Sequence, residues 1–256
     1  MKVLARFFES GAAIPLSVLF LWWYGSESGW WSAFLLPGPF VVLKSLTGLI
    51  ESGELARNIA SSMARIVKGF SVSAVIALSM AFVCGIYKPL FRALSPTVEF
   101  LRHIPPMALI PMLILWFGIG EASKIVIIVM ATFFPIFLNT VQGVSQCDKR
   151  LLEVARVFGY TRAQELRRVV LPSALPYILT GMRLGLGYSW RSLIAAELIA
   201  ASSGLGYMIL DAEQLSRPDV ILAGVLVIGC LGSLMDMSLS RLSVRFTSYG
   251  KSNAVA

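Results

Sequence analysis

The chain has 256 residues, of which 57% are hydrophobic and only 14% are charged, with a mean hydropathy of +0.77. A soluble domain carries about 25% charged residues, so this composition indicates an integral membrane protein. The net charge of +8 is divided among separate segments and forms no continuous basic patch, which argues against nucleic-acid binding.

Six apolar stretches approach the length of about 20 residues that a helix needs to cross a bilayer. They are expected at about 11–24, 69–87, 104–117 with a start near Thr97, 124–143, 176–200 and 220–242. Lys2 and Arg6 precede the first stretch, but no small-residue cleavage site follows it, so it is interpreted as a retained span. The expected fold class is an all-α polytopic membrane protein with about six transmembrane helices.

The chain divides into an N-terminal span with its outer connection, residues 1–53, and a core domain, residues 54–256. Gly, Pro and Trp residues between Ser26 and Pro39 predict irregular structure there. From Glu54 to Phe70 apolar residues recur every three or four positions, which predicts an amphipathic helix. This helix either lies at the membrane surface or extends the second span outward, and both alternatives stay open.

Orientation follows from the Lys and Arg residues, which favour the cytoplasmic side. With the amino and carboxyl termini inside, 14 of the 22 basic residues fall in cytoplasmic segments, 6 fall in outer segments, and Arg183 and Arg191 lie within a span. This arrangement places residues 144–175 in the cytoplasm.

One cytoplasmic segment is unusually charged and is predicted to form two short helices. The first covers about 151–158 and ends at Gly159, where a left-handed residue is usual. Thr161 is the N-cap of the second helix, with Gln164 completing a capping box, and Leu171-Pro172 is expected to end it. Such a pair suits docking of a partner protein, although a loop against lipid headgroups is the open alternative.

The spacing within this segment resembles the EAA motif of ABC-importer permeases. The matching residues are Glu153-Val154-Ala155, Gly159, Val169, Leu171 and Pro172, with Val154 and Val169 as mild departures. HIPPMALIPMLILWFGIGEASK (103–124) and GMRLGLGYSWRSLIAAELIAASSGLGYMI (181–209) are similar to the nitrate/sulfonate/taurine branch of that family. The likeness covers about residues 58–242.

The resemblance implies a type I ABC-importer permease fold, with cytoplasmic coupling helices between spans four and five. It implies a pore subunit in the bacterial cytoplasmic (inner) membrane that moves a small anion such as a sulfonate, taurine or nitrate. The coupling residues would be Glu153, Ala155, Gly159, Tyr160, Thr161, Leu171 and Pro172 within the segment 148–172.

The partners implied are a second copy of the chain, two cytoplasmic ATPase subunits, an extracytoplasmic solute-binding protein and membrane lipid. The chain has no GxxxxGK[ST] loop, so ATP and Mg²⁺ are expected in the partner ATPase, and this chain is expected to be no enzyme. Its single histidine, His103, and three scattered cysteines predict no metal site and no cofactor.

Charged residues within spans are costly and normally face protein or water. Arg183, Arg191 and Glu197 in the fifth span are candidate residues of the translocation pathway. Arg183 is as deep as Asp236 of the sixth span, so a salt bridge between them is the favoured alternative. Arg191 suits an anionic substrate, with bonding to carbonyls or to an acid of another span as its alternative.

Small residues within and after the fifth span suggest where helices approach and move. Gly181 and Gly185 form a small-xxx-small pair that permits close helix packing. Gly204 and Gly206 follow the span and are candidates for an outer gate.

Two other functions compete with the anion importer. One is the same type of importer for a vitamin precursor, such as a thiamine or riboflavin relative. The other is a stand-alone channel or secondary transporter, against which the EAA spacing argues.

Overall fold

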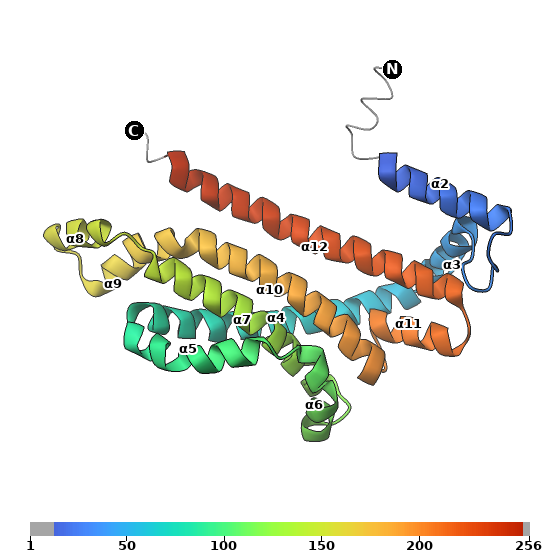
Figure 1. Ribbon diagram of the computed structural model, residues 1–256, viewed down its shortest axis with the longest axis horizontal. Coiled ribbons are helices and arrows are strands. Elements are labelled where there is room, and N and C mark those ends of the chain that lie inside the picture. Colours follow the sequence, from blue (N-terminus) through green and yellow to red (C-terminus); the bar gives the residue numbers. More distant parts are fainter. Residues whose placement is uncertain (1–12, 253–256) are drawn as a thin grey trace, which may run out of the picture.

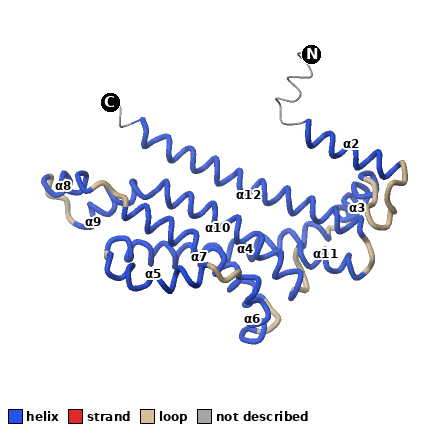
Figure 2. The backbone as a smooth tube through the Cα atoms, viewed as in Figure 1, coloured by secondary structure: helices blue, strands red, loops and turns tan. Residues whose placement is uncertain are grey.

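The computed structural model describes residues 13–252, with side chains for 13–243, and these residues form helices joined by turns, with no strand among them (Figures 1 and 2). In chain order the helices are α2 (Ala13–Glu27), α3 (Pro39–Glu51), α4 (Glu54–Ile86), α5 (Lys88–Arg102), the 3-10 turn η1 (Pro106–Leu109), α6 (Ile110–Phe117), α7 (Glu121–Ser145), α8 (Lys149–Val157), α9 (Arg162–Glu165), the π-helical turn η2 (Leu166–Val170), α10 (Leu171–Ala200), α11 (Leu205–Gln214) and α12 (Pro218–Ser252).

Four of these helical segments, Glu54–Ile86, Glu121–Ser145, Arg162–Ala200 and Pro218–Ser243, are long and apolar enough to cross a membrane. The pair α5 and α6 would make a fifth. The expected first span corresponds to α2, which has 15 residues in the described part. Lys2, Arg6 and the start of that span lie outside the described residues.

The core is built on α7, whose most extensive contacts are with α10 and α4. Gly181 and Gly185 of α10 lie against the α7 backbone. A Cβ on Gly181 would be 2.9 Å from the Pro135 carbonyl oxygen, and one on Gly185 would be 3.2 Å from the Thr132 carbonyl oxygen. The predicted close approach at this pair is therefore confirmed.

Helix α4 is continuous from Glu54 to Ile86, so residues 54–68 extend the second span rather than form a separate helix. Its buried face carries small and polar residues at helical spacing, among them Asn58, Ser62, Arg65, Gly69 and Ser73. Several of its large apolar side chains are largely exposed, as at Val67 and Val75, whereas Leu55 and Ile66 are buried. Polar and small residues on the buried face, with apolar residues on the exposed face, fit a helix that packs on protein on one side and on lipid on the other.

The expected third span is not one helix, and this prediction was wrong. Helices α5 and α6 meet at an angle of 80° across the break at 103–105. Pro105 has an extended backbone with φ −61° and ψ 125°, and Pro106 begins the 3-10 turn. Two consecutive prolines supply no N–H donors and disfavour helix in the preceding residue, so the chain bends sharply here.

Helix α12 lies across α10, α11 and α3 (Figure 1). The helix α3 was not predicted, and it is joined to the start of α12 by a hydrogen bond of 2.5 Å from Ser45 Oγ to Asp219 Oδ2. The short helices α8 and α9 lie at one end of the molecule, whereas α3 and α11 lie at the other (Figure 1).

Candidate functional site

The coupling segment, residues 148–172, begins as two short helices whose ends are fixed by capping interactions. The Asp148 carboxylate accepts a hydrogen bond of 2.9 Å from the Arg150 backbone N–H at the start of α8. Gly159 has φ +71°, and Thr161 and Gln164 form a complete capping box at the start of α9. The predicted left-handed glycine and N-cap are both confirmed.

Side chains also hold the two short helices together and leave an apolar tip exposed. Arg156 Nε donates a 3.2 Å hydrogen bond to Glu165 Oε1, and the Arg168 guanidinium lies 5.5 Å from the centre of the Tyr160 ring. Ala155 is buried, whereas Glu153 is exposed. Val157 and Phe158 are 87% and 76% exposed and form an unpartnered apolar tip.

The expected end of the second helix at Leu171-Pro172 was wrong, because the chain continues as helix into the membrane. Residues Arg162–Ala200 form one helical segment of 39 residues. A π-turn at Leu166–Val170 precedes Leu171-Pro172, and both Val170 and Leu171 keep helical backbone angles. A π-turn inserts an extra residue into the helical ladder, and Pro172 then occupies the first turn of α10, where its missing N–H is tolerated.

At the opposite end of the core, Arg65 of α4 is 3% exposed and joins α7 to α10. Its Nε and Nη2 donate to the two Glu121 carboxylate oxygens at 2.8 and 2.7 Å. Its Nη1 donates to Glu197 Oε1 and to the Ser203 carbonyl oxygen, each at 2.7 Å. Lys124 Nζ lies 3.4 Å from Glu121 Oε1. We call Arg65, Glu121, Lys124 and Glu197 the charge cluster.

Glu197 is fully buried, and the turn between α10 and α11 wraps around its carboxylate. Ser62 Oγ donates to it at 2.8 Å, and the Gly206 backbone N–H donates to Oε2 at 2.9 Å. Gly204 has φ +116°, and its N–H donates to Asn58 Oδ1 at 2.9 Å. A Cβ on Gly204 would be only 2.3 Å from Glu197 Oε1. Both candidate gate glycines thus have a close structural contact with Glu197.

The charge cluster was missed from the sequence, where Arg65 and Lys124 counted only as loop charges. The signal was present in the polar and small residues that recur along α4 at Asn58, Ser62 and Arg65. Such a face within a span predicts a buried partner of opposite charge. Glu197 lines neither of the two hollows that Arg183 and Arg191 line, and its pathway role stays a prediction.

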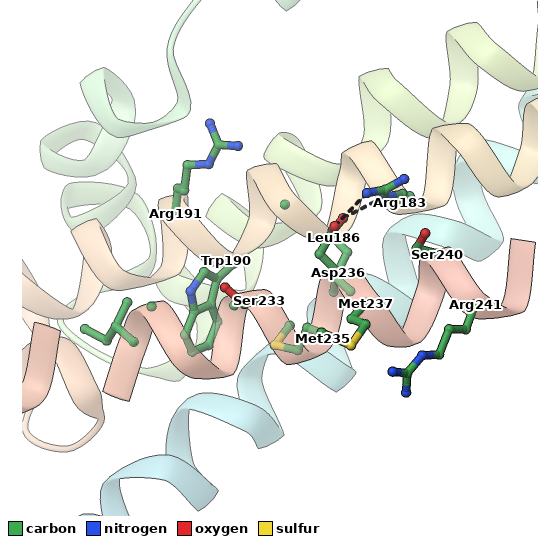
Figure 3. Close-up of a pocket in the computed structure, with 14 residues that line it drawn as sticks. Arg183, Leu186, Trp190, Arg191, Ser233, Met235, Asp236, Met237, Ser240 and Arg241 are labelled. Carbon is green, nitrogen blue, oxygen red and sulfur yellow. Dashed lines mark hydrogen bonds and ion pairs between the residues drawn. The ribbon is translucent and has the colours of Figure 1, made fainter. Parts of the chain in front are cut away.

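In the middle of the molecule, Arg183 of α10 and Asp236 of α12 form the predicted ion pair (Figure 3). Arg183 Nε donates to Oδ1 at 2.7 Å, and Nη2 donates to Oδ2 at 2.6 Å. Two parallel hydrogen bonds are the strongest geometry for this pair. The bridge crosses a cavity of about 670 Å³ between the two helices.

Arg191 lies on the exposed surface of α10, and its guanidinium points away from α12 (Figure 3). Among the described residues its one recorded partner is the Tyr188 ring, whose centre is 5.6 Å from Cζ. Arg183, Gly187, Tyr188 and Arg191 line a second hollow of about 340 Å³ along this face. Leu179 and Leu184 line the same hollow, so Arg191 lies on a mixed polar and apolar face that is open in the described chain.

Residues 54–247 match the family model described as the inner membrane component of binding-protein-dependent transport systems. A putative aliphatic sulfonates transport permease protein of Bacillus subtilis is 39% identical over 226 residues, which are 88% of this chain and 82% of that protein. A taurine transport system permease protein of Escherichia coli is 36% identical, covering 91% of this chain and 86% of that one.

A bicarbonate transport system permease protein of Synechococcus elongatus is 34% identical, covering 88% of this chain and 86% of that protein. Among solved structures, a chain of the MetNI methionine ABC transporter in an inward-facing conformation has a TM-score of 0.61 at 20% identity. The alignment covers 75% of this chain and 94% of that one. At that identity the likeness concerns the fold.

Proposed function

The chain belongs to the family of inner-membrane components of binding-protein-dependent transport systems, and from this premise we propose that this ABC-importer permease carries a small anion such as a sulfonate, taurine, nitrate or bicarbonate. The observation that carries the proposal is the likeness over most of the chain to permeases named for aliphatic sulfonates, taurine and bicarbonate. Family membership excludes the alternative of a stand-alone secondary transporter. None of the three relatives is named for transport of a vitamin precursor.

The coupling segment is the proposed docking site of the ATPase. Its exposed Val157 and Phe158 offer an apolar tip that fits a groove on a partner. The bridge from Arg156 to Glu165 and the caps at Asp148 and Thr161 hold that tip rigidly. Because residues 162–200 form one helical segment, a displacement of the tip is carried directly into α10.

The proposed assembly contains two copies of this chain, two ATPase subunits and an extracytoplasmic binding protein. ATP and Mg²⁺ belong to the ATPase in this proposal, and the chain described here contributes the pore. Its termini and the coupling segment lie in the cytoplasm, in agreement with the excess of Lys and Arg there. The turn between α10 and α11, at the other end of the core, then faces the binding protein.

Transport by the reconstituted complex tests this proposal. We expect proteoliposomes holding the chain with its ATPase, supplied with the binding protein, to accumulate radiolabelled taurine, an alkanesulfonate, nitrate or bicarbonate only with ATP. Accumulation of a thiamine or riboflavin relative, with none of these anions carried, would overturn the substrate class and leave the family assignment intact.

Coupling is tested at Gly159. Proline fixes φ near −65°, whereas Gly159 has φ +71°, so Gly159→Pro should abolish substrate-stimulated ATP hydrolysis and uptake. Gly159→Asn is the matched control, since asparagine adopts left-handed angles more readily than other side chains, and a Cβ here meets nothing within 4 Å. Normal stimulation in the proline variant contradicts the docking role.

Orientation is tested with single cysteines and a membrane-impermeant thiol reagent. Ser202, which is exposed in the α10–α11 turn, is a better site than Ser203, whose Oγ accepts a hydrogen bond from Arg65. Ser202→Cys should react from outside intact cells, and Arg168→Cys should not. The opposite pattern would invert the proposed topology.

A further inference from the structure

We propose that Arg191 is the positive centre of an anion site on the open face of α10, and that the transported anion passes against its guanidinium. The inference rests on the proposed function and adds the residue that recognises the charge. The ligand class is a small oxyanion whose two or three oxygens can accept hydrogen bonds from a planar guanidinium.

The first observation is that Arg191 is available to a ligand. It is exposed, and its guanidinium points away from α12 (Figure 3). Its contact with the Tyr188 ring, at 5.6 Å, uses none of its N–H groups in a recorded hydrogen bond. A Cβ placed on Gly187 would be 3.9 Å from Arg191 Nη2 and would meet no other neighbour within 4 Å. The glycine therefore leaves space beside the guanidinium.

The second observation is that the nearby acid, Asp236, is already paired with Arg183. Asp236 lines both hollows with Arg191, but both of its oxygens accept hydrogen bonds from Arg183. That pair is neutral as a unit, so Arg191 is left as an uncompensated charge. Among the described residues that line the larger cavity, Asp236 is the only acid.

The third observation is the position of this charge within a membrane-spanning segment. A bare guanidinium facing lipid is costly, so the surface around Arg191 borders protein or water. The hollow along Arg183, Gly187, Tyr188 and Arg191 extends this open face along α10. A water-filled path beside α10 solvates Arg191 and attracts anions to it.

The local charge is tested with a thiol placed beside the guanidinium. Gly187→Cys is made in a chain whose three native cysteines are replaced by serine, assembled with its ATPase. Its rates of reaction with an anionic and a cationic methanethiosulfonate are then compared. A positive charge about 4 Å away favours the anionic reagent and disfavours the cationic one, so Arg191→Gln should lower the anionic-to-cationic rate ratio about tenfold or more.

The matched control removes a charge pair instead of a single charge. Arg183→Gln combined with Asp236→Asn deletes one positive and one negative group from the same hollow, so the ratio should change by less than about twofold. Arg191→Lys keeps the charge and should keep most of the ratio. A ratio that is insensitive to Arg191→Gln, or a thiol that neither reagent reaches, overturns the proposal in favour of a partner-covered Arg191.

Uptake measurements then distinguish a failure of the Arg191 anion site from a failure of the proposed substrate class. Once a carried anion is identified, Arg191→Gln should raise the KM for uptake of that anion at least tenfold. Arg191→Lys should raise this KM less, because lysine keeps the positive charge but lacks the planar N–H donors of the guanidinium. If no tested anion is carried, the substrate class fails while the labelling ratio still decides the role of Arg191. Failure of both Arg191→Gln and Arg191→Ala to assemble would make the residue structural and overturn the site.

Discussion

Two of the charged side chains on helix α10, Arg191 and Glu197, have opposite surroundings. Glu197 is fully buried and accepts hydrogen bonds from Ser62, Arg65 and the Gly206 backbone. Arg191 is exposed, and among the described residues its recorded partner is only the Tyr188 ring. Six residues of helix rotate the side chains by about 240°, so one helix presents them to different neighbours.

The comparison separates two uses of charge within a membrane. A buried charge with several hydrogen-bond partners ties helices together, and removal of one partner leaves it uncompensated. An open charge that lacks an acid partner is costly in lipid and is suited to a charged substrate. Hydropathy alone treats both residues as interruptions of the same span.

The largest effect is expected from removing Arg65, because Glu197 would remain buried without its cation. Arg65→Met should lower the stability of the purified complex by about 3–5 kcal/mol, the usual result of breaking a buried ion pair from one side. Thermal unfolding in detergent measures this loss. Arg57→Met on the same helix is the control, since Arg57 is exposed and a surface change should stay within about 0.5 kcal/mol. Equal effects of the two variants would contradict a structural role for the cluster.

A smaller effect is expected where the turn between α10 and α11 wraps around Glu197. Gly204 has φ +116° and ψ 170°, a region open almost only to glycine, where other residues cost about 1–3 kcal/mol. In the Gly204→Ala variant the new Cβ also overlaps Glu197 Oε1. The unfolding temperature of this variant should therefore fall further than backbone strain alone predicts.

Gly118→Ala is the matched control for this overlap. Gly118 has similar angles, φ 78° and ψ 174°, but a Cβ there meets nothing within 4 Å. The difference between the two variants isolates contact with the carboxylate. If Gly118→Ala is as damaging as Gly204→Ala, the packing of the turn onto Glu197 contributes nothing.

The smallest effect is expected from deleting the Arg183–Asp236 pair as a unit. Both side chains are about half exposed, and removal of both leaves no bare charge, so Arg183→Gln with Asp236→Asn should barely shift the unfolding temperature. Asp236→Asn alone leaves Arg183 uncompensated and should shift it more. A double variant that is less stable than either single variant would show that this bridge, like the charge cluster, holds helices together.

The sequence predicted the local chemistry of the chain better than its long-range contacts. Gly159, the Thr161–Gln164 box and the Gly181–Gly185 approach follow from rules that act over a few residues, and the structure has all three. The break at Pro105-Pro106 was missed because an apolar run was interpreted as one helix. The Leu171-Pro172 error arose because a π-turn, which has no sequence signature comparable to a cap, carries the helix through a proline.

The ion pairs show the same limit. Arg183–Asp236 could be predicted because equal depth on two neighbouring spans makes a contact geometrically possible. Arg65 with Glu197 could not, since 132 residues separate them and Arg65 lies in a segment interpreted as an amphipathic helix outside the second span. Only the packing of α4 and α10 around α7 brings these two side chains together.

The most direct test of the account compares Glu197→Gln with Arg191→Gln in the same reconstituted complex, measuring the unfolding temperature and ATP-driven anion uptake for each. Glu197→Gln should lower the unfolding temperature, since it removes the buried partner of Arg65. Arg191→Gln should leave that temperature within about 1 °C of the wild type, as expected for an exposed surface change, while uptake at low substrate concentration falls at least about tenfold because bidentate, charge-assisted binding is lost. Loss of stability in Arg191→Gln with uptake unimpaired per assembled complex would contradict the division of roles along α10.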